Sequence, residues 1–247
     1  MHRDPEKEIV TIRVKGRKDL ARKVAEKFYE SLGRLLSSKD KVVVSLAGGR
    51  SVQSFYERIP GMADLLSGGD WRRVHFFWTD ERLVPPGSYE SNYGLAEDLF
   101  LGELMGRDLV RPDQIHRFPG ETSGPSRALK SYRDDLEKIS NGVIHLPVLG
   151  VGGDGHVGSL FPGSAQLNEN SSEFSLVEAS PKPPKERVTI SPRLIRESKY
   201  PFLFFIGEEK REAYECFRAE ATTYSDCPCK LAFSGSPGVC YVVTDLD

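Results

Sequence analysis

Three short apolar runs, each followed by glycine or charged residues, constrain the fold of this chain most strongly. They span residues 42–47, 74–79 and 144–149. Continuous apolar runs of this length are typical of strands that are buried on both faces of a parallel sheet. Parallel strands place their carboxyl ends at one edge of the sheet, and ligands of such sheets bind outside that edge. We therefore expect the residues that follow the three runs to converge in one cleft.

Amphipathic segments alternate with the apolar runs. Residues 18–38 carry leucine, valine and phenylalanine at helical spacing with charged residues between them, which predicts a helix that covers a sheet. Further helices are predicted at residues 52–59, 92–101 with Ser91 as the cap, 126–139 and 208–219. Further strands are predicted at residues 8–14, 174–179, 187–191, 200–206, 231–233 and 239–243. The alternation predicts an α/β fold, a mostly parallel Rossmann-like sheet flanked by helices, with one domain over residues 1–247 and a small C-terminal strand extension.

Charge and hydropathy exclude several classes of partner. The chain has 34 basic and 36 acidic residues, so its net charge of −2 gives no general bias toward nucleic acid or anionic membranes. No apolar run approaches the roughly 20 residues of a membrane span, and residues 1–10 are charged, without an apolar signal region. We therefore expect a cytoplasmic protein without nucleic-acid or membrane partners, either a monomer or a weak homo-oligomer.

Four cysteines, Cys216, Cys227, Cys229 and Cys240, cluster near the C-terminus. Cys227 and Cys229 form a C-x-C pair and lack the C-x₂-C spacing that is typical of structural zinc sites. The sequence therefore predicts reduced, partly buried thiols and no metal.

The run at residues 144–149 leads into a loop in which several glycines surround Asp154 and His156. Glycines let backbone N–H groups approach a bound oxygen closely, and histidine is the side chain whose ordinary pKa, about 6.5, suits proton transfer near neutral pH. This pattern favours a chemical role for His156 over that of a structural core histidine. The loop also matches G-x-G-x-x-G, but the acid about 20 residues on, Glu169, lies in a polar segment and ends no strand. We therefore expect no nicotinamide cofactor.

The other two strand ends carry candidate anion ligands. Residues 48–51, Gly-Gly-Arg-Ser, lie between a strand and a helix and resemble a phosphate cradle, or else form an ordinary turn with a surface arginine. Residues 80–82, Asp-Glu-Arg, form either a helix cap or part of a site, in which Arg82 contacts a phosphate or a hydroxyl. Lys210 lies in a first helical turn, where a lysine opposes the helix dipole, so it is a candidate phosphate ligand or a surface lysine.

Several motifs of the chain resemble those of the 6-phosphogluconolactonase family, in the family's order. They are residues 46–51 (LAGGRS), 78–82 (WTDER) with Ser91-Asn92, 149–162 (LGVGGDGHVGSLFP), 187–189 (RVT) and 207–210 (GEEK). The resemblance covers nearly the whole chain. Gly153 stands where the family often has proline, and Gly158 where it often has a small residue such as alanine.

The resemblance implies the fold shared with glucosamine-6-phosphate deaminase and ribose-5-phosphate isomerase. It implies hydrolysis of 6-phospho-D-glucono-1,5-lactone to 6-phosphogluconate, without metal or cofactor, in the pentose phosphate pathway. We expect His156 to act as general base on water and Asp154 to orient it. The residues expected to bind the substrate are Gly48, Gly49, Arg50, Ser51, Asp80, Arg82, Asn92, Gly152, Gly153, Arg187 and Lys210.

Two other functions stay open at this point. Deaminase–isomerases of the same superfamily have a glutamate five residues after the histidine, where this chain has Phe161, which favours the lactonase. A non-catalytic sugar-phosphate-binding protein is disfavoured by the intact pair of Asp154 and His156. Ser159 is not expected to be a nucleophile, because no G-x-S-x-G elbow surrounds it.

Overall fold

A six-stranded parallel sheet forms the centre of the computed structural model, which describes residues 7–13, 16–168 and 173–247. The strand order is β1-β9-β8-β5-β2-β3, and each pair of neighbours is parallel. The strands are β1 (Glu8–Arg13), β2 (Val42–Leu46), β3 (Val74–Trp78), β5 (Leu146–Gly150), β8 (Phe202–Phe205) and β9 (Val239–Thr244). The predicted fold class is thereby confirmed.

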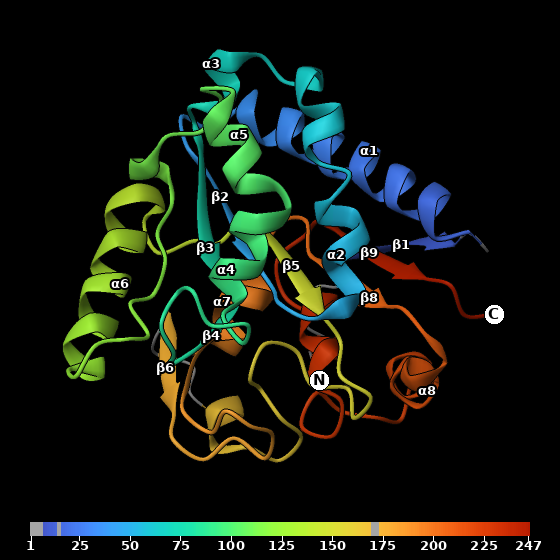
Figure 1. Cartoon of the computed structure of the whole chain (residues 1–247). Helices are drawn as coiled ribbons and strands as arrows, with labels where there is room; N and C mark the ends of the chain where they lie inside the picture. The colour runs from blue at the N-terminus through green and yellow to red at the C-terminus, as the bar shows by residue number, and fades with distance from the viewer. Residues whose placement is uncertain (1–6, 14–15, 169–172) are drawn as a thin grey trace.

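Helices cover both faces of this sheet (Figure 1). One hydrophobic cluster joins α1 (Arg17–Leu36) and α2 (Arg50–Tyr56) to strand residues such as Val44 and Phe76. The other cluster joins α6 (Pro125–Ser140), α7 (Pro192–Glu197) and α8 (Arg211–Arg218) to the neighbouring residues of the same strands, such as Val43 and Phe77. Successive strand residues thus point to opposite cores, which explains why the runs are apolar throughout.

The strand order places a topological switch beside β2. The chain passes from β2 to β3 on one side and later returns to β5 on the other side of β2. The two connections leave the carboxyl ends of β2 and β5 in opposite directions, which opens a crevice between them, the usual ligand position in open α/β sheets.

A small antiparallel sheet adds residues from the second half of the chain to this edge. Its strands are β4 (Asp80–Arg82), β7 (Arg187–Ile190) and β6 (Phe174–Val177), in the order β4-β7-β6. In the register of β4 with β7, Asp80 lies opposite Thr189 and Arg82 lies opposite Arg187. This pairing carries Arg187 to the end of β3.

Three sequence predictions need correction. Residues 231–233 are not a strand, since Pro228–Ala232 forms a 3₁₀-helix with proline in its first turn. β9 lies between β1 and β8 in the main sheet and is not an extension of it. The predicted helix 92–101 is α4 (Asn92–Ala96) followed by a π-helical turn (Glu97–Leu101) and α5 (Gly102–Gly106). Ser91 does cap α4, because its hydroxyl accepts from the N–H of Gly94.

Short helices complete the described chain. They are α3 (Gly68–Trp71) and the 3₁₀ turns Pro60–Leu65, Pro112–Gln114, Ala165–Asn168 and Glu208–Lys210. The predicted strand residue Val14 lies outside the described residues, as does Glu169. Within the described ranges, no helix has the length and apolar character needed to cross a membrane.

Candidate active site

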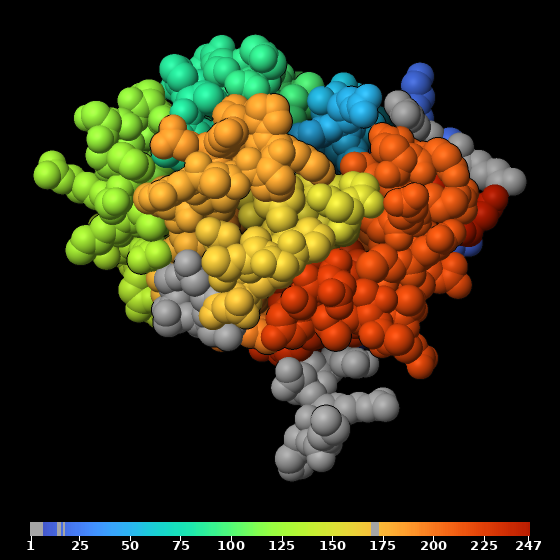
Figure 2. Space-filling model, turned by 90° about the horizontal axis from the view of Figure 1, so that it is seen from below, coloured from blue at the N-terminus to red at the C-terminus, as the bar shows by residue number. Residues whose placement is uncertain are grey.

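A cavity of about 180 Å³ lies at the carboxyl ends of β2 and β5. Eleven of the thirteen predicted site residues line it, namely Gly48, Gly49, Arg50, Ser51, Asp80, Arg82, Asn92, Gly152, His156, Arg187 and Lys210. Asp154 and Gly153 are the two that do not. Figure 2 looks onto this edge of the sheet, where the yellow stretch that contains residues 150–165 lies between the orange and red-orange segments that follow it in the chain. The three strand ends therefore converge as the apolar runs predicted.

Asp154 and His156 form a hydrogen-bonded pair at the rim of the cavity. Oδ1 of Asp154 contacts Nδ1 of His156, whose side chain is 15 % exposed. The tautomer with hydrogen on Nδ1 leaves Nε2 as the basic nitrogen, which suits a general base. Burial raises the pKa of Asp154, but the hydrogen bond from His156 and the charge of Lys182 outweigh this effect and hold the pKa well below its usual range. Asp154 is therefore ionised and holds the imidazole through Nδ1.

The glycine loop holds this pair through its own backbone. The N–H of Gly152 donates to the carbonyl of His156 at 2.9 Å, and the N–H of Gly155 donates to the carbonyl of Gly152 at 3.0 Å. Over residues 151–164 the described backbone is not helical, so the G-x-G-x-x-G match does not open the helix that a dinucleotide site requires.

A side chain at position 152 would collide with the catalytic candidates. A Cβ on Gly152 would lie 2.0 Å from Nδ1 and Cε1 of His156 and 2.6 Å from Oδ1 of Asp154. We predict that Gly152→Ala lowers kcat/KM about tenfold to a hundredfold, because the imidazole must move from its position. Steady-state kinetics of lactone hydrolysis would measure this. Gly87→Ala is the matched control, since a Cβ there meets open space; equal activities of the two variants would contradict the prediction.

Lys182 is a site residue that the sequence did not indicate. Its Nζ lies 3.4 Å from Oδ2 of Asp154 and 3.4 Å from Nδ1 of His156. It also lies over the ring of Phe161, which itself packs against the ring of His156 with centroids 4.5 Å apart. Its only sequence signal is its place in a Pro/Lys-rich loop, residues 181–185, which follows the small-sheet strand β6 and no strand of the parallel sheet.

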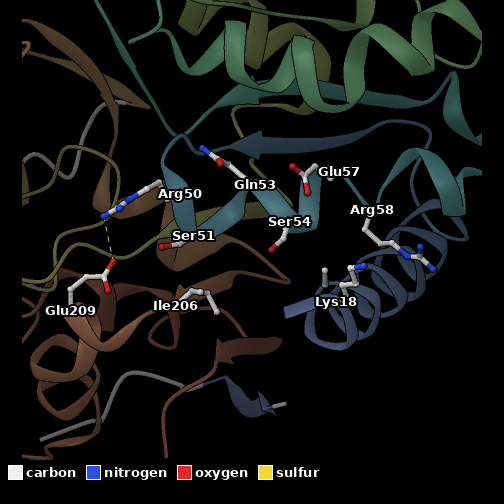
Figure 3. A pocket seen from close by; sticks show the side chains of 10 residues that line it. Lys18, Arg50, Ser51, Gln53, Ser54, Glu57, Arg58, Ile206 and Glu209 are labelled. Atoms are coloured by element: carbon white, nitrogen blue, oxygen red, sulfur yellow. Dashed lines mark ion pairs between the residues drawn. The ribbon is translucent and has the colours of Figure 1, made fainter. Parts of the chain in front are cut away.

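The cations that line the cavity differ in their exposure and in the protein groups that already bind them. Arg50 has an 87 % exposed side chain and lies 3.5 Å from Glu209, which it faces across the opening (Figure 3). Lys210 is half-buried, and this burial lowers its pKa, an effect that the charge of Glu209 partly offsets. Arg82 donates from its guanidinium to the carbonyl of Glu90. Arg50 and Lys210 are therefore the cations best placed to take an anion.

Arg187 is buried and organises the wall of the cavity. Its Nε donates to the carbonyl of Pro184, and its Nη2 donates to the carbonyls of Lys182 and Pro183. Its Nη1 lies 3.3 Å from Oγ of Ser159 and 3.7 Å from Oδ2 of Asp80. This arrangement fixes the loop that carries Lys182 and leaves Arg187 little donor capacity for a substrate.

The side chains of Ser159 and Asn92 also form part of the cavity wall, because both donate hydrogen bonds to Asp80. The hydroxyl of Ser159 donates to Oδ2 of Asp80 at 2.8 Å. The amide of Asn92 donates to the carbonyl of Asp80 at 2.7 Å and occupies the space beside Gly48, where a Cβ would lie 1.8 Å from Oδ1 of Asn92. Glycine at position 48 is thus required by close packing.

Glu81 is a helix cap and points away from the chemistry. Its carboxylate accepts from the N–H groups of Arg82, Asn92 and Tyr93 and from the hydroxyl of Ser91, at 2.7 to 3.1 Å. Burial raises its pKa, although the three backbone N–H groups work in the opposite direction. Of the two interpretations of residues 80–82, the cap therefore applies to Glu81 and the site to Asp80 and Arg82.

We predict that Glu81→Ala lowers the free energy of unfolding by about 3 kcal/mol, because buried N–H groups at the start of α4 lose their acceptor. Urea denaturation followed by circular dichroism would measure the loss. Glu81→Gln keeps one carbonyl oxygen and should lose clearly less. A Glu81→Ala variant as stable as the wild type would show that the cap contributes nothing.

A larger hollow of about 670 Å³ lies beside the cavity, between α1 and α2 (Figure 3). Lys18 and Arg58 are at its far end, and it shares Arg50, Ser51 and Glu209 with the cavity. His156 lines the smaller cavity and not this hollow, so the chemistry belongs to the smaller one.

The family of the chain follows from comparison with known proteins. The family model described as glucosamine-6-phosphate isomerases/6-phosphogluconolactonase matches residues 15–240. A 6-phosphogluconolactonase from Borreliella burgdorferi is 28 % identical over 83 % of this chain and 85 % of its own length. A probable chloroplastic 6-phosphogluconolactonase 4 from Oryza sativa subsp. japonica is 32 % identical over 84 % of this chain, but the match spans only 66 % of that longer protein.

Solved structures agree with the fold. The crystal structure of 6-phosphogluconolactonase from Thermotoga maritima has a TM-score of 0.76 at 25 % identity and covers 96 % of this chain and 99 % of its own. A monomeric glucosamine-6-phosphate deaminase has the same TM-score of 0.76 at 18 % identity, over 96 % of this chain and 97 % of its own, so the fold alone does not separate the two activities. The family expected from the motifs is confirmed, and this chain belongs to the glucosamine-6-phosphate isomerase/6-phosphogluconolactonase family.

Proposed function

We propose that this protein hydrolyses 6-phospho-D-glucono-1,5-lactone to 6-phosphogluconate, the lactonase step of the pentose phosphate pathway. The observation that carries the proposal is the pair of Asp154 and His156 at the rim of a cavity whose other walls hold Arg50 and Lys210. A lactone that bears a phosphate needs a base at one end and cations at the other. The cavity supplies both within one small volume.

In the proposed reaction, Nε2 of His156 takes a proton from water as the water oxygen bonds to the lactone carbonyl carbon. The carbonyl oxygen becomes the oxyanion of a tetrahedral intermediate. The intermediate then collapses as the bond from the carbonyl carbon to the ring oxygen breaks, and His156 returns its proton to that oxygen. Asp154 holds the imidazole and stabilises its charged form. Positioned proton transfer of this kind contributes roughly 10²- to 10⁴-fold in rate.

The glycine loop contributes less to the oxyanion than its composition suggests. The N–H groups of Gly152 and Gly155 already donate within the loop, so we do not assign them this role. We assign the 6-phosphate to Arg50, Lys210 and the turn at residues 48–51, with Arg82 nearby. α2 has only seven residues, so the side-chain charges outweigh its dipole.

The ring of Phe161 favours the lactonase over the deaminase. It packs on the imidazole of His156 at the position where the deaminases carry a glutamate. An apolar ring there cannot supply the carboxylate that assists opening of an amino-sugar ring. The same family model includes both activities, so this contact is the feature that discriminates between them.

The test is lactone hydrolysis with coupled detection of 6-phosphogluconate, corrected for spontaneous hydrolysis. We expect the protein to accelerate hydrolysis far above the spontaneous rate and to release no ammonia from glucosamine 6-phosphate. Ammonia release without lactone hydrolysis would favour the deaminase. Binding of 6-phosphogluconate without turnover of either substrate would identify a non-catalytic sugar-phosphate-binding protein.

A further inference from the structure

Three of the four cysteines lie close together, and this group packs against the loop that carries Asp154 and His156, which we call the catalytic loop. Sγ of Cys227 lies 3.4 Å from Sγ of Cys229, and both residues are buried. Cys216, on α8, is partly exposed, and its thiol interacts with that of Cys227. The thiols therefore form a connected group that reaches from the surface to the interior.

This group touches the backbone between Asp154 and His156. The N–H of Cys229 donates to the carbonyl of Gly155 at 2.9 Å. A Cβ on Gly155 would lie 3.2 Å from Sγ of Cys227, so this sulfur packs against the Cα of Gly155. Gly155 has a φ of 81°, a conformation that favours glycine. The turn that places His156 thus rests on the two cysteines.

The four thiols differ in their readiness to ionise. The hydrogen bond from Cys229, together with the thiol of Cys216 and the charge of Lys230, lowers the pKa of Cys227 to about 7 against the opposing effect of burial. Burial raises the pKa of Cys240 to about 12 and also raises the pKa of Cys229. The thiolate is the nucleophilic form of cysteine, so Cys227 is the member of the group that is most readily converted into the nucleophile.

We propose that Cys227 and Cys229 form an oxidant-modification site that takes hydrogen peroxide or a small hydroperoxide and, once oxidised to a disulfide, impairs the catalytic loop. The Cys227 thiolate attacks a peroxide oxygen, an S–O bond forms and the O–O bond breaks, and the released hydroxide takes a proton. Sγ of Cys229 then attacks the sulfenic sulfur; the S–S bond forms, the S–O bond breaks, and the hydroxide leaves as water with the Cys229 proton. Two thiols lose two electrons, and one hydrogen peroxide is reduced to two waters.

The disulfide changes the support of Gly155. A disulfide requires the two sulfurs to approach to about 2.05 Å, so the 3.4 Å that separates them must shorten by about 1.35 Å. Sγ of Cys227 then leaves the Cα of Gly155, and the N–H of Cys229 loses its alignment with the carbonyl of that residue. We expect about a tenfold loss of kcat/KM, because small displacements of catalytic groups are costly. This activity readout rests on the proposed lactonase function.

The experiment treats the whole protein with hydrogen peroxide, alkylates the remaining thiols and digests with trypsin. Residues 219–230 form one tryptic peptide that contains both Cys227 and Cys229, while Cys216 lies in the peptide of residues 212–218. We expect the first peptide to lose two hydrogen atoms and resist alkylation while Cys216 and Cys240 stay alkylated. Lactone hydrolysis should fall in parallel and recover with dithiothreitol.

Two variants separate the alternatives. Cys216→Ser should keep the peroxide sensitivity, and Cys229→Ser should lose the reversible inhibition. A disulfide that joins the two tryptic peptides, or full alkylation of Cys227 after peroxide, would overturn the assigned pair, and a disulfide without loss of activity would overturn its effect on the loop. The thiol readout needs no turnover, and the reduced protein reports the lactonase activity by itself, so failure of either proposal is recognised separately.

Discussion

Replacement of His156 by alanine should lower kcat/KM for 6-phosphogluconolactone about 10³-fold, within the range of positioned general-base catalysis. The imidazole is held by Asp154 through Nδ1, and its removal takes away the proposed general base. The cations to which we assign the phosphate lie on other segments, after the ends of β2 and β8. We therefore expect kcat to fall and KM to change little.

The measurement is steady-state kinetics with the spontaneous rate subtracted, at a pH where that rate is slow. Asp154→Asn is the matched variant, because asparagine still offers an oxygen to Nδ1 but removes the negative charge that stabilises an imidazolium. Its activity should lie between those of the wild type and His156→Ala. A His156→Ala variant that retains a tenth or more of the wild-type kcat would show that another group is the base.

Most of the parallel sheet was predictable because its strands are buried on both faces. Runs such as residues 42–47 and 74–79 have one explanation in a chain of this length, and each became a strand of the main sheet. The short strand at residues 80–82 was not predicted, and the strand predicted at residues 231–233 was wrong. A three-residue strand exists only through its pairing with β7, and three apolar residues carry no periodicity.

The residues of the candidate site were likewise predictable only in part. The residues that directly follow β2, β3 and β5 were predicted, because strand topology alone brings them together. Lys182 was not, because it follows no strand of the parallel sheet, and hydrogen bonds from Arg187 to the carbonyls of residues 182–184 help to hold its loop near His156. The sequence also did not show that Asp80 lines the cavity while Glu81 caps α4, because this difference arises only when neighbouring residues of a strand point to opposite sides.

A second large effect, a loss of stability, is expected in acid from three histidines outside the site: His75 and His145 are buried, and His116 is half-buried. Nδ1 of His75 lies 3.0 Å from Nε2 of His116 at the edge of β3. Nδ1 of His145 accepts the N–H of Val43 at 2.9 Å. Burial lowers the pKa of each of the three to about 4. The folded protein therefore keeps these histidines neutral at pH values where the unfolded chain binds protons.

The charges around these histidines do not reverse this effect. His116 disfavours the protonation of His75, and Lys41 disfavours the protonation of both histidines, whereas Asp113 works in the opposite direction. Lys39 likewise lowers the pKa of His145. His116 gains more from the charge of Asp113 than it loses to Lys41, but burial outweighs this gain.

The sign of the pH dependence follows from the two pKa values. Unfolded histidine has a pKa of about 6.5, so the stabilisation by neutral histidines is complete above that pH and is lost as the pH falls toward about 4. Three protons bound on unfolding give a slope of up to about 4 kcal/mol per pH unit and a total loss of about 7 kcal/mol by pH 4.5. This is a large share of the roughly 5 to 15 kcal/mol that stabilises a typical domain.

Urea denaturation between pH 7.5 and 4.5 would measure this loss, with histidine titration followed by NMR on the folded protein. His145→Gln is the matched variant, because its side-chain oxygen still accepts the N–H of Val43 but binds no proton. It should reduce the slope between pH 6.5 and 5 by one proton and leave the stability at pH 7.5 nearly unchanged. Folded-state histidine resonances that titrate near pH 6.5, together with a flat stability profile, would show that burial does not keep these rings neutral.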